Sequence, residues 1–285
     1  MTPEKDRFKF VFGSQAYDLA SRTHIMGIVN VTPDSFSDGG LFFDQERAVA
    51  HGRELAEQGA DILDIGGEST RPGSDPVSEQ EEIRRVVPVI ERLSHECTVP
   101  LSIDTYKANV ARAALAAGAC IVNDISGLTY DPGMIEVVLE HQATVVLMHI
   151  LGTPKTMQVQ PVYQDVVREV FEFLESRAGV ARSRGIRQII IDPGLGFGKE
   201  LEHNLDLVRH LQKFKRLGHP VIVGPSRKSF IGKILDLPVH QRLEGTAAAV
   251  TASIMHGANI VRVHDVREMK RVAQVADALK EPGGE

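Results

Sequence analysis

The sequence contains little cysteine and no long apolar run. Cys97 and Cys120 are the two cysteines in 285 residues, which is too few for a disulfide framework and lacks the paired spacing of a zinc site. Residues 1–9 are charged and no apolar segment follows them, unlike a signal peptide. No apolar run approaches the roughly 18 residues of a membrane-spanning helix. We therefore expect a soluble cytoplasmic protein without a membrane partner.

An excess of basic residues is also lacking. Lysine and arginine number 32 against 38 acidic residues, which gives a net charge of -6 and argues against nucleic acid as a partner. Any bound anion must therefore meet locally placed cations. The hydrophobic fraction of 42% and charged fraction of 25% exclude disordered and fibrous classes. The length suits one domain, residues 1–285, whose core needs no metal or disulfide.

Short apolar runs rich in isoleucine and valine alternate with segments of helical period. Each run is too short for a buried helix and is typical of a strand covered on both faces. The runs are Ile25–Asn30, Ile62–Gly66, Leu101–Asp104, Cys120–Asn123, Thr144–Met148, Ile189–Asp192, Val221–Gly224 and Ile260–His264. Such an even series favours an α/β fold, a (β/α)₈ TIM barrel at about 24–280, over a doubly wound sheet with fewer strands.

The segments around these runs predict helices, turns and a hairpin. Helical apolar spacing occurs in Val162, Val166, Val170 and Leu174, and again in Val272, Val275, Ala276 and Leu279. Left-handed helix ends are expected just before strands at Gly59, Gly118, Gly185, Gly218 and Gly257. Near the N-terminus, alternating Phe8, Phe10 and Phe12 precede Gly13. This pattern predicts a short β-hairpin that closes the bottom of the barrel.

Each predicted strand leads to a polar or charged side chain at its carboxyl end, where the loops of a barrel converge over one mouth. Each such residue alone has an ordinary structural explanation: Asp104 could cap a helix and Lys228 could be a solvated cation. Together they predict a functional site, because packing alone does not require this pattern. The residues at or just after the strand ends include Asn30, Thr70, Arg71, Asp104, Asn123, Met148, Asp192, Ser226, Lys228, Arg262 and His264.

Three of these side chains suit a flat heterocycle. Asp104, Asn123 and Asp192 come from different strands and are expected to point into the barrel lumen. Carboxylates can accept paired N–H bonds from an aminopyrimidine edge, and Lys228 can donate to a ring carbonyl. A magnesium cage is an alternative use of the two acids, although it is unusual at a barrel floor. Apolar contacts to the ring faces are expected from Met148 and Phe197.

Cations are expected above that heterocycle. Arg71, Arg262 and His264, together with the Thr70 hydroxyl, suit a phosphate or diphosphate. Asn30 is placed to hold a magnesium ion on the diphosphate, since Mg²⁺ takes few protein ligands besides phosphate oxygens. The pattern therefore predicts a heterocycle in the lumen with a diphosphate at the mouth.

Four motifs give the sequence a resemblance to the dihydropteroate synthase family of pterin-binding barrels. The motifs are Met26–Gly40, Asp64–Gly73, Asp192–Lys199 and Ser226–Ser229, and the likeness extends from Met26 to Val266. One departure is the apolar pair Ile150-Leu151, in a segment where the family often has methionine or asparagine first.

The resemblance implies a reaction and a set of contacts. The reaction condenses 6-hydroxymethyl-7,8-dihydropterin pyrophosphate with p-aminobenzoate, with Mg²⁺ as cofactor, in a homodimer built through the last helices. The implied catalytic residues are Asp104, Lys228, Arg262 and His264. The implied pterin contacts are Asp104, Asn123, Asp192 and Lys228. The implied pyrophosphate contacts are Thr70, Arg262 and His264, with Asn30 and magnesium. The implied p-aminobenzoate contacts are Phe36, Arg71, Pro72, Phe197 and Ser226.

Two other functions stay open from the sequence. A methyltransferase of the same superfamily, which moves a methyl group from a methyltetrahydrofolate to a corrinoid protein, would share the acidic lumen. It would not need the Ser69–Pro72 loop or the pair formed by Arg262 and His264. A non-catalytic pterin-binding barrel should lack one of the cations or Asn30, whereas all are present.

Overall fold

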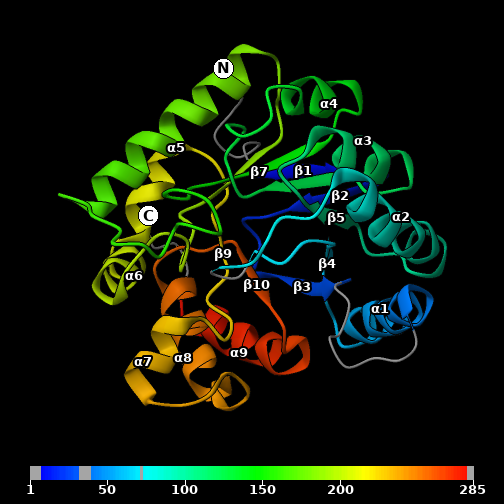
Figure 1. Cartoon of the computed structure of the whole chain (residues 1–285). Helices are drawn as coiled ribbons and strands as arrows, with labels where there is room; N and C mark the ends of the chain where they lie inside the picture. Colours follow the sequence, from blue (N-terminus) through cyan, green and yellow to red (C-terminus); the bar gives the residue numbers. More distant parts are fainter. Residues whose placement is uncertain (1–7, 32–39, 71–72, 281–285) are drawn as a thin grey trace.

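The computed structural model describes residues 8–31, 40–70 and 73–280. Eight parallel strands form a nearly closed barrel with helices between them on the outside (Figure 1). The strands are β3 (His24–Asn30), β4 (Ile62–Gly66), β5 (Leu101–Asp104), β6 (Ile121–Asp124), β7 (Thr144–Met148), β8 (Ile189–Asp192), β9 (Ile222–Val223) and β10 (Ile260–Val263). Their order is β8-β7-β6-β5-β4-β3-β10-β9. A single bridge between Ile191 and Val221 joins the last strand to the first, which confirms the TIM-barrel prediction.

The predicted strands all occur, and four of them have the predicted bounds. Cys120 precedes β6 instead of beginning it, and β9 is shorter than the predicted Val221–Gly224. The shortening has a local cause, because the amide of Val221 donates to the Asn259 side chain at 3.0 Å and only a single bridge links Val221 to β8. Differences of one or two residues at the end of a strand do not change which residues pair across the sheet. The last run is likewise shorter, since β10 ends before His264.

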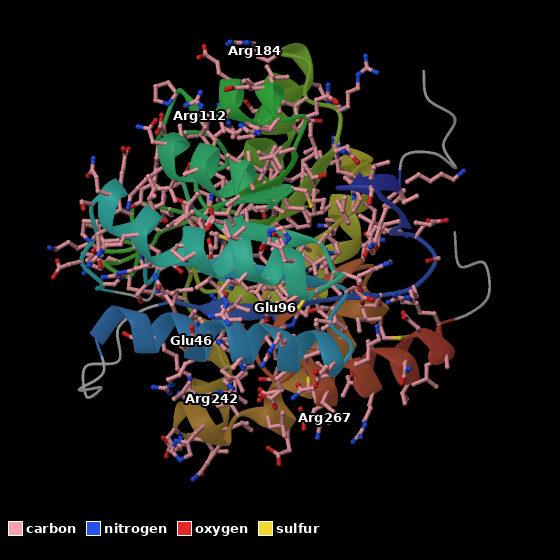
Figure 2. The ribbon with its side chains drawn as sticks, turned by 90° about the vertical axis from the view of Figure 1, so that its right-hand side faces the viewer. Glu46, Glu96, Arg112, Arg184, Arg242 and Arg267 are labelled. Carbon is pink, nitrogen blue, oxygen red and sulfur yellow. The ribbon has the colours of Figure 1, made fainter. Side chains whose placement is uncertain are left out.

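Helices cover the outside of the barrel, and most of them bury one face against it. The α-helices are α1 (Gly40–Glu57), α2 (Glu79–Glu96), α3 (Ala108–Ala116), α4 (Met134–Glu140), α5 (Val166–Ser183), α6 (Leu201–Arg209), α7 (Ser229–Leu235), α8 (Leu243–Met255) and α9 (Val266–Leu279). The described residues also include two 3₁₀ helices, η2 (Leu211–Leu217) and η3 (Val239–Gln241). Charged side chains such as Glu46, Glu96 and Arg267 cover the outer faces of these helices (Figure 2).

Two details of the predicted helices are wrong. Val162 is 78% exposed and precedes α5, because Asp165 caps that helix by accepting a hydrogen bond from the Arg168 amide at 3.0 Å. In α9 the predicted face included Val275 and Leu279, which are exposed. The buried face of α9 instead consists of Val266, Met269, Ala273 and Ala276. Val266 and Met269 pack on the barrel together with the two alanines, whereas Val275 and Leu279 lie on the opposite face.

All five glycines expected at left-handed helix ends have positive φ, between +72° at Gly218 and +118° at Gly118. At Gly118 an added Cβ would also lie 2.8 Å from the Ser94 side chain. Both the positive φ and the lack of space therefore require glycine in the turn before β6. The glycine prediction is confirmed.

The N-terminal hairpin closes the bottom of the barrel, as predicted. It pairs β1 (Lys9–Phe12) with β2 (Gln15–Asp18) in antiparallel register. Phe10 and Phe12 are 4% and 2% exposed, and they pack on a layer of lumen side chains. That layer contains Met26, Ile62, Ile121, Val146, Ile190, Ile222 and Ile260. The lower lumen is therefore filled mainly by apolar side chains, and the carboxylates of the lumen lie toward the opposite end.

Both cysteines are free thiols. In the part of the chain that the structure describes, no helix has the length and apolar character needed to cross a membrane.

Candidate functional site at the barrel mouth

Polar side chains form a second layer in the lumen, two residues further along the strands than the apolar layer. Strand residues two positions apart point to the same side, so Asp64 follows Ile62 and Asn123 follows Ile121 into the lumen. Asp192 follows Ile190 in the same way. The geometry thus brings Asn123 and Asp192 into the lumen, as the sequence predicts, and adds Asp64, which the sequence analysis did not single out. An acid in the middle of an otherwise apolar strand was the available signal.

Arg262 lies at the centre of this polar layer. Its Nε donates to Asp64 Oδ2 at 2.6 Å, and its Nη2 donates to Asp104 Oδ2 at 2.7 Å. The Asn123 amide donates to the same Asp64 oxygen at 3.0 Å. Three strands are therefore linked to β10 through one guanidinium and one carboxylate. Arg262, predicted to bind pyrophosphate, therefore belongs to the same hydrogen-bonded network as Asp104 and Asn123, which were predicted to bind the pterin.

Burial raises the pKa of two carboxyl groups at this mouth. Desolvation raises the pKa of Asp192 to about 6, although its Oδ1 accepts from the Gly194 amide at 2.7 Å and Lys228 lies nearby. Desolvation also raises the pKa of Asp104, against the opposing charge of Arg262. Asp104 Oδ1 is buried without a hydrogen-bond partner among the described residues. Such an acceptor is suited to a ligand N–H group.

Lys228 faces the same lumen from the start of α7. Its Nζ lies 4.0 Å from the centroid of the Phe197 ring, a cation–π distance. Desolvation, with help from the Arg262 charge, lowers the pKa of Lys228 to about 8. Gly196 has φ +82°, and a Cβ there would lie 3.0 Å from the Lys228 side chain. The glycine-rich segment after β8 therefore leaves the space that this lysine occupies.

His264 pairs with Ser226 rather than with an acid. The Ser226 Oγ lies 2.9 Å from His264 Nδ1 and accepts from the His264 backbone amide at 3.2 Å. Burial, followed by the charge of Arg262, lowers the pKa of His264 to about 3. The expectation that His264 is a cation is therefore wrong for the free protein, because a neutral imidazole is favoured beside that guanidinium. Ser226 can donate to Nδ1, which leaves the Nε2–H as a donor.

Apolar side chains form one wall of the mouth. Met148, at the end of β7, is 3% exposed and packs with Ile125, Ile150 and Met157. Phe197 lies against the same cluster. The two residues predicted to contact the ring faces are thus brought together. Ile150 belongs to the pair Ile150-Leu151, at which the sequence differs from the family it resembles, and its side chain packs in this cluster.

A buried lysine holds the segment that carries Phe197. Lys199 is 3% exposed, and its Nζ lies 3.0 Å from His149 Nδ1 and donates to the Phe197 carbonyl at 2.9 Å. Desolvation lowers the pKa of Lys199 to about 7 and that of His149 to about 2. A Cβ on Gly194 would lie 2.0 Å from the His149 carbonyl oxygen. Close backbone approach therefore fixes this loop against the end of β7.

A second, partly buried lysine anchors the loop that follows β4. Lys107 Nζ lies 2.6 Å from Glu68 Oε2 and 2.6 Å from Glu82 Oε2, and it also donates to the Val77 carbonyl. The Tyr106 hydroxyl donates to the other Glu68 oxygen at 2.6 Å. Desolvation raises the pKa of Glu82 in spite of Lys107. No local pattern in the sequence indicates this network, since its members are distant along the chain.

The remaining predicted residues lie at the rim or outside the described part. Asn30 is exposed at the end of β3, and Thr70 is partly buried after β4. Phe36, Arg71 and Pro72 lie outside the described residues. Within residues 8–31, 40–70 and 73–280, no cluster of three or more histidine, cysteine, aspartate or glutamate side chains is arranged to hold a metal ion.

The chain is similar to known proteins along nearly its whole length. A model of the pterin binding enzyme family matches residues 26–264. A dihydropteroate synthase from Synechocystis sp. is 50% identical over 270 residues, which are 94% of this chain and 93% of that protein. A solved Xanthomonas albilineans dihydropteroate synthase with 4-aminobenzoic acid superposes with a TM-score of 0.90 at 46% identity, over 97% and 99% of the two chains. A Yersinia pestis dihydropteroate synthase with a sulfonamide drug complex has a TM-score of 0.88 at 42% identity, over 95% and 98%.

Proposed function

The chain belongs to the dihydropteroate synthase family of pterin-binding enzymes, and we propose how the residues at its mouth carry out the family's transfer reaction. The substrates are 6-hydroxymethyl-7,8-dihydropterin pyrophosphate and p-aminobenzoate, and the products are 7,8-dihydropteroate and pyrophosphate. The observation that carries the proposal is the network in which Arg262 joins Asp64 and Asp104 directly beside Asn123. It combines acceptors for a pterin with a cation for a diphosphate.

The pterin ring is held in the lumen by hydrogen bonds. The unpartnered Asp104 Oδ1 and the Asp192 carboxylate accept ring and amino N–H groups, and Asn123 supplies a further polar contact. Lys228 donates to the ring carbonyl from its position over Phe197. Met148 and Phe197 contact the ring faces. The apolar wall and the acidic floor explain how a flat polar ring is bound deep in the barrel.

The diphosphate lies at the rim, within reach of donors. Arg262 supplies the positive charge, and Thr70 and neutral His264 supply hydrogen-bond donors. Arg71, outside the described residues, is expected to add a second cation. Asn30 fits a magnesium ion that is held mainly by phosphate oxygens, because its exposed carboxamide offers one oxygen ligand and no acidic cage is needed. Magnesium would neutralise charge on the leaving pyrophosphate.

The transfer breaks one bond and forms another. The bond between the pterin methylene carbon and the pyrophosphate oxygen breaks, and its electron pair leaves with pyrophosphate. Arg262 stabilises that departing charge. The methylene carbon becomes electron-poor and conjugated with the ring, a state favoured by the nearby carboxylates of Asp104 and Asp192. The p-aminobenzoate nitrogen then forms the new C–N bond and releases one proton to water. Asp104, Lys228, Arg262 and His264 are therefore the proposed catalytic residues.

The p-aminobenzoate site lies beside the pterin methylene. Phe197 and Ser226 are the described residues proposed for it, and Phe36, Arg71 and Pro72 are proposed from the sequence. Support comes from the Xanthomonas albilineans relative with 4-aminobenzoic acid and the Yersinia pestis relative with a sulfonamide drug complex. We propose that sulfonamides compete for this same site.

The assembly and location are also proposed. Residues 1–285 act as one domain, and two copies pair through α7, α8 and α9, which lie together on one side of the barrel (Figure 1). Support comes from the large apolar side chains exposed there, which include Ile234, Leu235, Val239, Leu243, Met255, Val275 and Leu279. Two free thiols favour the reducing cytoplasm. Small molecules, and neither nucleic acid nor membrane, are the proposed ligands.

Pyrophosphate release tests the proposed reaction. The purified protein is mixed with the dihydropterin pyrophosphate and Mg²⁺, with and without p-aminobenzoate. We expect release that depends on p-aminobenzoate and is lost in Lys228→Ala and Arg262→Ala. Lys233→Ala and Arg267→Ala, on exposed positions of α7 and α9, are the matched controls. Tight pterin binding without release would contradict the proposal and favour a methyltransferase or a non-catalytic pterin binder.

A further inference from the structure

We propose that Asp64 is a positioning residue that selects the donor pattern of the bound ring by fixing the orientation of Asn123. This proposal rests on the proposed function, since it assigns specificity at the same site. Asp64 touches neither substrate in this scheme. It acts through two residues that do, Asn123 and Arg262.

Asp64 is fully buried, and its two carboxylate oxygens differ in their hydrogen bonds. The residue is 0% exposed, and its Oδ2 accepts both from Asn123 Nδ2 at 3.0 Å and from Arg262 Nε at 2.6 Å. Its Oδ1 is buried without a hydrogen-bond partner among the described residues. A buried acid with an unpartnered oxygen is costly to fold. An aspartate here is therefore better explained by what it does to its two neighbours than by stability.

The Asp64 carboxylate fixes which end of the Asn123 carboxamide faces the ring. An asparagine amide has an acceptor oxygen and a donor nitrogen of nearly equal size, so shape alone does not fix which one faces a ligand. An ionised carboxylate can only accept hydrogen bonds. Asp64 therefore draws the Asn123 nitrogen toward itself and turns the carboxamide oxygen away. Asn123 then presents an acceptor to the ring, like Asp104 and Asp192.

Asp64 also holds the guanidinium of Arg262 in place. Asp64 takes its Nε–H while Asp104 takes an Nη2–H, so the planar guanidinium is held at two points and its remaining N–H groups are left for an anion. Loss of the Asp64 carboxylate would free one of these points. Asp64 thus affects the ring through Asn123 and the departing diphosphate through Arg262.

Asp64→Asn separates these effects from a general loss of structure. Two probes are compared by calorimetry: 6-hydroxymethylpterin, which carries a 2-amino donor, and 6-hydroxymethyllumazine, which carries a 2-oxo acceptor in its place. In this variant the Asn123 carboxamide can flip, so that its nitrogen instead of its oxygen faces the ring. The ratio of the affinities for the amino probe and the oxo probe should therefore fall by about tenfold. The kcat of the synthase reaction should fall by about a hundredfold.

Asp61→Asn is the matched control. Asp61 is a paired acid three residues earlier, just before β4 at the other end of the barrel, where it pairs with Arg22 and Lys270. The change removes a paired carboxylate that is 10% exposed, without reaching the lumen. We expect it to lower the midpoint of thermal unfolding while leaving the ratio of the two probe affinities unchanged.

A charge swap supplies a second variant should Asp64→Asn fold poorly. In Asp64→Asn with Asn123→Asp, the buried pair keeps one carboxylate and one carboxamide. The residue at position 123 is again an acceptor, so the amino preference should return to within about threefold of the parent protein. The kcat should stay low, because the carboxylate no longer lies at Arg262 Nε.

The outcomes distinguish this proposal from the proposed function. Parent protein that forms no dihydropteroate would overturn the proposed function, whereas the probe ratio still tests Asp64. An active parent whose amino preference is equal in Asp64→Asn would overturn the positioning role. A swap that folds without regaining the preference would also overturn it.

Discussion

The Arg262 guanidinium donates from Nη2 to Asp104 Oδ2 across 2.7 Å, so a cation proposed for the pyrophosphate is tied to an acid proposed for the pterin. A second bond, from Nε to Asp64, fixes the plane of the guanidinium. This geometry couples the two halves of the substrate through one side chain. It also makes the shape of the cation, as well as its charge, important for the reaction.

Arg262→Lys should therefore be nearly inactive. A lysine ammonium is a point charge on a flexible stem and cannot hold both carboxylates in the planar arrangement. We expect kcat for dihydropteroate formation to fall by about a hundredfold, as measured by pyrophosphate release. Arg267→Lys, an exposed position on α9, should retain the parent rate. Parent-like kcat in Arg262→Lys would show that charge alone suffices.

The pH dependence of kcat/KM should have two limbs. Desolvation raises the pKa of Asp192 to about 6 and lowers that of Lys228 to about 8. Pterin binding needs the acid deprotonated and the lysine protonated, so kcat/KM should rise as pH increases through the first value and fall above the second. Burial also raises the pKa of Asp104, so Asp192→Asn should shift the acidic limb without abolishing it, and Lys228→Arg should move the alkaline limb upward. A flat profile from about pH 5 to pH 9 would contradict these assignments.

Gly194→Ala should damage the loop that carries Phe197. Gly194 has φ +71°, and a Cβ there would lie 2.0 Å from the His149 carbonyl oxygen. The strained backbone and the overlap should together cost about 3 kcal/mol or more in the free energy of unfolding, measured with urea. Gly13→Ala has φ +60° but open space around it, so strain alone should cost about 1 kcal/mol. Equal losses in the two variants would argue against the close approach.

Phe12→Ala should destabilise the barrel without changing its chemistry. Phe12 is 2% exposed in the hairpin under the lumen, and loss of a buried aromatic ring costs about 3–5 kcal/mol. KM for both substrates should stay unchanged in protein that remains folded, because the site is at the other end of the strands. Val11→Ala changes an exposed neighbour, 54% exposed, and should leave the unfolding midpoint unaltered. A changed KM in Phe12→Ala would mean that the hairpin affects the mouth.

Lys107→Met should loosen the base of the loop after β4. The substitution leaves Glu68 and Glu82 buried without their shared cation, a loss of about 3–5 kcal/mol for a broken buried pair. Urea unfolding should show this loss, and limited proteolysis should detect earlier cleavage in the loop. Arg112→Met breaks an exposed pair with Glu140 and should cost less than about 1 kcal/mol. Similar losses in both variants would refute an anchoring role for Lys107.

The sequence by itself determined the barrel. Apolar runs of strand length, the spacing of the helices between them and the left-handed glycines are local properties, and they predicted all eight strands and the hairpin. Alternation along a strand also determined that Asn123 and Asp192 point into the lumen. Local pattern was less informative for α9, whose apolar residues occur on both faces, so that Val275 and Leu279 are exposed while Val266 and Met269 face the barrel.

Only the tertiary structure decided which polar groups are partners. Asp64 and Arg262 are 198 positions apart, and their bond exists because β4 and β10 lie on either side of β3. The same closure buries His264 beside a guanidinium, which lowers its pKa and makes it neutral rather than cationic. Desolvation and Coulomb interactions depend on distance in space, not along the chain. The charges and pairings of the mouth therefore follow from the closed barrel, while the barrel itself follows from the pattern of its residues.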